Sequence, residues 1–129
     1  MDSLLKEIYT ALQADSLTLA MMGARAVIEA AIIAKVEDHG TFKDNLQALE
    51  DAGHLSKTNR EHLEVALDAG SASAHRAHRP NNDQMNTVMD IVENLLNSLF
   101  ALEDATKALK AAIPPRPPKK KKSKPITVQ

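Results

Sequence analysis

Residues 85–109 read MNTVMDIVENLLNSLFALEDATKAL, and this stretch decides the fold class of the chain. Its large apolar residues recur at intervals of three, four or seven, at Met85, Val88, Val92, Leu95, Leu99, Leu102 and Leu109. Such spacing places side chains on one face of an α-helix, so the stretch predicts a long amphipathic helix. We expect this helix to span residues 82–113, with Asn81 and Gln84 capping its start and Pro114 ending it.

The residues upstream of this helix carry the same kind of pattern in shorter runs. Apolar spacing predicts helices over about residues 2–13, 16–38, 41–52 and from the Thr58–Glu61 capping box onward. Gly40 and Gly53 are typical helix stops, and Gly70 is expected to interrupt the fourth helix. We therefore expect an all-α bundle of four to five helices over residues 1–113, without β-strands.

The composition restricts the class of protein. The 129 residues suffice for one domain whose core is built from aliphatic side chains, because the chain has two Phe, one Tyr and no Trp. With no cysteine, disulfide scaffolds and zinc–thiolate sites are excluded. We expect a soluble, cytoplasmic protein without a membrane span, signal peptide, metal or other cofactor.

Charge is divided unevenly along the chain. Six of the 16 basic residues lie in a Pro/Lys-rich segment over residues 114–129, namely Arg116, Lys119, Lys120, Lys121, Lys122 and Lys124. Residues 1–113 keep 10 basic and all 17 acidic residues, a net charge of −7. Proline and like-charge repulsion predict a flexible, solvated tail. This tail either only improves solubility or contacts nucleic acid or an acidic partner.

Residues 67–78, LDAGSASAHRAH, hold small residues followed by two histidines. The segment is either a tight packing elbow or the remnant of a nucleotide-handling site. We expect Gly70 and Ala74 to pack closely against the second helix and His75 to be buried and hydrogen-bonded. Because a metal needs a third ligand beside His75 and His78, and only Asp68 or Asp83 is at hand, we expect no metal site.

Three segments together carry a family resemblance: GARAVIE at 23–29, TFKDNLQALEDAGHL at 41–55, and the elbow from Gly70 to His75. They resemble the domain-of-unknown-function family four-one-four-five, which looks like a branch of the HEPN (higher eukaryote and prokaryote nucleotide-binding) helical superfamily. The resemblance implies a HEPN-like bundle, frequent dimers and links to restriction or other defence systems. In the family's usual elbow an Arg stands where this chain has Leu67, and an Asn where it has Ser71.

This departure bears on catalysis, because ribonuclease members of the superfamily place an Arg before the His to hold phosphate. The catalytic candidates here, His75, Arg76 and Arg79, have the arginines after the histidine. Arg25 and Glu29 are one helical turn apart and are expected to form a structural ion pair.

Three functions remain open. The leading hypothesis is a non-catalytic helical interaction module rather than an enzyme, whose wide apolar stripe over residues 85–102 pairs two copies into a homodimer. It leaves room for a further protein partner. The first alternative is a divergent HEPN-type ribonuclease or nucleotide-binding toxin domain that uses His75. The second is a small regulator that binds nucleic acid through its basic tail.

Overall fold

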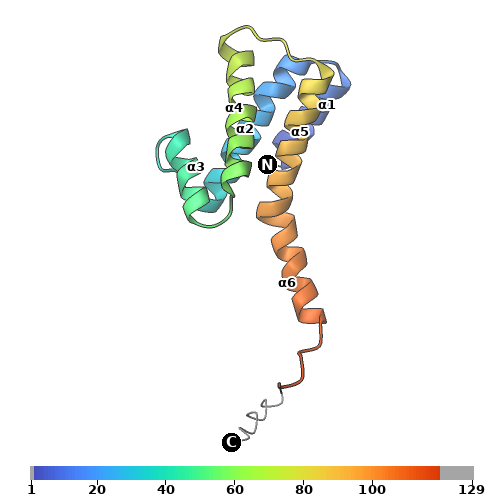
Figure 1. Ribbon diagram of the computed structural model, residues 1–129. Helices are drawn as coiled ribbons and strands as arrows, with labels where there is room; N and C mark the ends of the chain where they lie inside the picture. Colours follow the sequence, from blue (N-terminus) through green and yellow to red (C-terminus); the bar gives the residue numbers. More distant parts are fainter. Residues whose placement is uncertain (1, 120–129) are drawn as a thin grey trace, which may run out of the picture.

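The computed structural model describes residues 2–119 and is all-α, without a strand in that range. Its helical segments are α1 (Asp2–Gln13), α2 (Leu17–Val36), α3 (Phe42–Asp51), α4 (Lys57–His75), α5 (Asn82–Leu96), the π-helical turn η1 (Asn97–Ala101) and α6 (Leu102–Ala112). α5, η1 and α6 follow one another without a break, so the predicted long helix is confirmed (Figure 1). Residues 113–119 form no helix.

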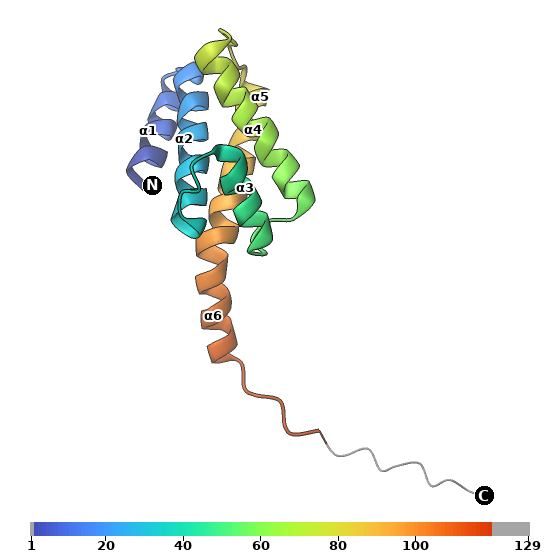
Figure 2. The same cartoon turned by 90° about the vertical axis from the view of Figure 1, so that its left-hand side faces the viewer.

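Helix α2 lies at the centre of the bundle and contacts α1, α3, α4 and α5 (Figures 1 and 2). Seven of its residues are buried: Ala20, Met21, Ala24, Val27, Ile28, Ala31 and Ile32. By length and composition alone α2 is apolar enough to cross a membrane, a property that core helices of soluble proteins share. Here its apolar side chains form the core, because four other helices surround it.

The apolar stripe of the long helix is buried only in its first part. Met85, Val88, Val92, Leu95 and Leu99 belong to the core of one chain. The part of the predicted dimer stripe that precedes Leu102 is therefore largely covered by the chain's own helices. Leu102 and Leu109 belong to the same sequence pattern, but their side chains are 50% and 61% exposed. Two causes act together. The wider turn η1 shifts the register of the helix, and α6 extends past the end of the bundle (Figures 1 and 2).

The start of α6 is held against α2 by the ammonium group of Lys35. Lys35 Nζ lies 2.7 Å from Glu103 Oε2 and 5.1 Å from the centroid of the Phe100 ring. The hydrogen bond from Lys35, and then its charge, lower the pKa of Glu103 below its usual value of 4.5. Glu103, and not Leu102, therefore faces the end of α2.

Most helix ends follow the sequence signals. Asn81 and Gln84 form the predicted capping box, and Thr41 accepts a hydrogen bond from the backbone N–H of Asp44 at 3.1 Å. Two predictions for α4 are wrong. Its N-cap is Ser56, one residue before Lys57, in place of the capping box at Thr58. It also continues through Gly70 to His75 without interruption.

Gly70 is needed for packing and not for a turn. A Cβ atom at this position would lie 2.6 Å from Cβ of Arg25 and 3.3 Å from the backbone oxygen of Met21. Only a residue without a side chain lets α4 approach α2 this closely. The predicted small-residue seam between these helices is thus confirmed at Gly70.

Candidate functional site

The elbow at the end of α4 differs from its predicted arrangement. Ala74 and His75 are exposed, so the expectations that Ala74 packs in the seam and that His75 is a buried packing residue are wrong. The reason is helical phase: Gly70 and Ser73 point towards α2, and the positions after Ser73 turn towards solvent. No side-chain hydrogen bond joins His75 to another residue in the range 2–119.

The two arginine candidates have different environments. Arg76 Nη2 lies 2.6 Å from Asp68 Oδ1 and also donates to the backbone oxygen of Asp68 at 3.2 Å. Its charge is therefore directed back along α4. Arg79 is exposed, and within residues 2–119 it makes neither an ion pair nor a side-chain hydrogen bond. The structure thus does not assemble His75 and an arginine into a joined pair.

Arg25 and Glu29 form the expected ion pair across one turn of α2, with Arg25 Nε 3.2 Å from Glu29 Oε1. Arg25 Nη1 also donates to the backbone oxygen of Leu67 at 3.4 Å, which links α2 to α4 beside Gly70. Both side chains are about one-third exposed. The predicted ion pair is thus formed, and it lies at the contact between α2 and α4.

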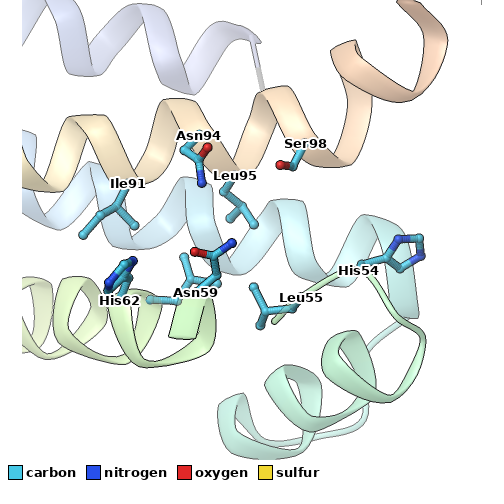
Figure 3. Close-up of a pocket in the computed structure, with 9 residues that line it drawn as sticks. His54, Leu55, Asn59, His62, Ile91, Asn94, Leu95 and Ser98 are labelled. Atoms are coloured by element: carbon cyan, nitrogen blue, oxygen red, sulfur yellow. The ribbon is translucent and has the colours of Figure 1, made fainter. Parts of the chain in front are cut away.

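A small polar cleft separates the start of α4 from α5 and η1 (Figure 3). Asn59 and His62 of α4 point towards α5, where Asn94 and Ser98 form part of the opposite wall, over a floor that includes Leu55 and Leu95. Its volume of about 30 Å³ holds little more than a single water molecule. The cleft can order water, but it has no room for a substrate.

A larger hollow lies at the opposite end of the bundle, between the start of α2 and the connection from α4 to α5. Its volume is about 450 Å³, and both Arg79 and His78 line it. The sequence pattern identified these two residues. It did not predict that Thr18 and the buried Ser73 would join them. A serine within a run of small residues gives no signal until its neighbouring helix is known.

The sequence also suggests a histidine pair and a basic tail as candidate sites. Within residues 2–119, no group of three or more His, Asp or Glu side chains could hold a metal ion. Arg116 and Lys119 are exposed beyond the end of α6. The remaining predicted tail contacts lie outside the described residues, namely Lys120, Lys121, Lys122 and Lys124.

The family described as "Domain of unknown function (DUF4145)" matches residues 6–112, which include every helix from α2 to α6 and most of α1. The chain belongs to the DUF4145 family. No curated protein and no solved structure matches it. For this DUF4145 protein, the function must therefore be argued from its own residues.

Proposed function

We propose that this DUF4145 protein is a non-catalytic interaction module that works as a homodimer and that α6 supplies the dimer contact. The observation that carries the proposal is the exposure of three large apolar side chains, two on α6 and one directly after it. Leu102, Leu109 and Ile113 are 50%, 61% and 57% exposed, and α6 has no buried residue. Water disfavours an apolar stripe on a projecting helix, so a partner surface that covers it is favourable.

The two faces of α6 are separated by charge. At about 100° per residue, one face carries only uncharged residues, which are Ala101, Leu102, Ala105, Thr106, Ala108, Leu109, Ala112 and Ile113. The other face carries all four charged residues of α6, which are Glu103, Asp104, Lys107 and Lys110. Alanines beside the leucines allow a second helix to approach closely. This pattern favours a helix as the partner.

The uncharged face of α6 does not continue along α5, because the π-helical turn η1 lies between Leu95 and Leu102 and shifts the register of the helix. Leu95 is accordingly buried in the core, whereas Leu102 is 50% exposed. The proposed contact is therefore the uncharged face of α6 itself.

Charge favours an antiparallel second copy as the occupant. In a parallel pair, the two basic tails, each with six basic residues from 114 to 129, would lie side by side and repel. In an antiparallel pair, each tail lies over the partner's body, whose net charge is −7. Exposed Asp90 and Glu61, which precede cleft residues Ile91 and His62, provide acidic groups there.

The arrangement around His75 supports the choice of a non-catalytic role. Arg76 is engaged by Asp68, and His75 has no side-chain partner within residues 2–119. A ribonuclease needs a positioned base and a cation beside it to hold phosphate. A HEPN-like affiliation and a link to defence systems rest on the sequence resemblance, and a cytoplasmic location rests on the composition; all three form part of the proposal.

The proposal is tested by the mass of the protein in solution. Leu109→Glu places a charge in the uncharged face of α6 and should convert a dimer into a monomer. Val65→Glu is the matched control, because Val65 is 68% exposed on α4 and lies outside the proposed contact. Light scattering should give a dimer for the wild type and for the Val65 variant. A monomeric wild type, or equal loss in both variants, would refute the proposal.

A further inference from the structure

An apolar groove lies between α1 and the junction of α5 with η1. Its lining comes from two parts of the chain, with Asp2 and Leu5 on α1 and Glu93, Leu96, Asn97, Phe100 and Ala101 on the long helix. The volume of the groove is about 400 Å³. Leu5, Leu96 and Phe100 are half-buried, so each leaves part of an apolar side chain open to water. The bundle itself therefore does not cover this surface.

The groove meets the proposed dimer contact at Ala101. This residue lines the groove and also begins the uncharged face of α6. In the proposed dimer the two α6 helices run in opposite directions, so the end of each α6 lies beside the start of the partner's α6. The segment that follows the second copy's α6 is thus delivered next to the groove.

This segment has the chemistry that an apolar groove can receive. It reads Ile113–Pro114–Pro115–Arg116, and all four residues are exposed. Ile113, the C-cap residue of α6, has extended backbone angles, with φ −85° and ψ 127°. Extended proline-containing segments bind grooves with aromatic side chains in their walls, and Phe100 supplies such a ring here.

Charge at the rim of the groove matches the same occupant. Asp2 and Glu93 are exposed, and among residues 2–119 neither forms an ion pair. The hydroxyl of Tyr9 donates to Glu93 Oε1 at 2.7 Å, which holds this carboxylate between α1 and α5. Arg116 follows the two prolines directly, and Lys119 comes three residues later, so the occupant brings the opposite charge to the rim.

The chain's own segment is not placed to fill the groove. Ala101 and Ile113 flank α6, and at 1.5 Å per residue they lie about 18 Å apart along the helix axis. Four extended residues span at most about 14 Å, so residues 113–116 cannot turn back over this distance. Helix α6 also points away from the bundle (Figures 1 and 2). A second copy is therefore the occupant that the fold favours.

We infer that the groove between α1 and η1 holds residues 113–116 of the second copy, an arrangement that rests on the proposed antiparallel dimer. Ile113 and the two prolines cover the apolar wall, and Arg116 pairs with the carboxylates of Asp2 and Glu93. Because a two-fold dimer is reciprocal, each copy fills the groove of the other. The dimer contact then includes α1 as well as α6.

Disulfide trapping between two differently tagged full-length chains tests this contact, because the chain contains no cysteine. One chain carries Asn97→Cys, at an exposed position in the groove, and the other carries Pro115→Cys. Mild oxidation should join the two tags in one species. In the matched control Val65→Cys replaces Asn97→Cys, and it should give little cross-linking, because Val65 is exposed on α4 away from the groove.

Charge reversal provides an independent measurement of the dimer's dissociation constant. Arg116→Glu should raise this constant about fivefold, because repulsion replaces attraction at an exposed rim. Arg79→Glu is the matched control, since it changes the net charge equally but lies in the connection from α4 to α5. It should have little effect.

The outcomes distinguish this inference from the proposed function. If the wild type is a dimer but Asn97→Cys cross-links no better than Val65→Cys, or if both charge reversals weaken the dimer equally, the inference is overturned and the contact through α6 stands. A cross-link that forms only within one chain carrying both cysteines assigns the groove to the chain's own tail and overturns it too. A monomeric wild type refutes both.

Discussion

Gly70 shows how one residue sets the distance between two helices. Its absent side chain lets α4 lie against Arg25 and the backbone of Met21 on α2. Elsewhere in a helix, alanine in place of glycine would stabilise by up to about 1 kcal/mol. At this position the added Cβ meets another Cβ at 2.6 Å, and that atom cannot move without its backbone. The free-energy cost of this steric crowding should therefore exceed the gain in helix propensity from glycine to alanine.

Gly70→Ala should accordingly destabilise the protein, with an overpacking cost of roughly 1–3 kcal/mol. Thermal unfolding followed by circular dichroism measures the effect. Ala74→Leu is the control on the same helix: Ala74 is exposed, so its stability should stay within about 0.5 kcal/mol of the wild type. An unfolding temperature that does not change in Gly70→Ala would show that the seam between α2 and α4 is looser than described.

The Lys35–Glu103 contact predicts a dependence of stability on pH. The pKa of Glu103 is lower in the folded state than its usual value of 4.5, so the contact stabilises above that value. This stability is lost as the pH falls through the lowered folded pKa. Between about pH 5 and pH 3, a Glu103→Gln variant should therefore lose less stability than the wild type. A larger loss in the variant, measured by chemical denaturation, would contradict this sign.

Residue-level prediction from the sequence succeeded where the signal is local. Arg25 and Glu29 are four positions apart on one helix, so their ion pair follows from helix geometry alone. The expected burial of His75 failed, because it depends on the phase of α4 against α2, which Gly70 fixes through a contact distant in sequence. The polar hollow at Ser73 was not foreseen for the same reason, since three separate segments build it.

At the scale of elements, the helices and their capping residues could largely be predicted from the amino-acid sequence. The capping box at Asn81 and Gln84 and the cap at Thr41 depend on residues three positions apart, and both formed as expected. The π-helical turn η1 was not foreseen, because no local residue pattern marks it. It places Glu103 beside Lys35 and separates the core stripe of α5 from the exposed stripe of α6.

The tail should contribute nothing to the stability of a single bundle. Residues 113–119 are exposed throughout, and the apolar face of α6 ends at Ile113. In the Leu109→Glu background, where the dimer should be absent, deletion of residues 114–129 is expected to leave the unfolding temperature unchanged. Circular dichroism provides the measurement. A cooperative loss of stability in the deleted variant would show that the tail docks on its own bundle.

At the scale of the whole molecule, the bundle around α2 and the projecting helix α6 have separate roles. Residues buried around α2 stabilise one chain, whereas α6 extends beyond that core and buries none of its own residues (Figure 2). The charge follows the same division, with an acidic body and a basic tail. Both features are satisfied when two copies pair through α6, which is the central claim of the proposed function, with the two helices antiparallel.

The most direct test of this claim compares two alanines on opposite faces of α6. The chain contains no cysteine, so Ala105→Cys and Ala111→Cys each provide one site for a pyrene label. Ala105 lies on the uncharged face, and Ala111 lies among the charged residues. We predict strong excimer fluorescence from labels at position 105 and little from position 111. Absence of excimer at position 105, or equal excimer at both positions, would contradict dimerisation through α6.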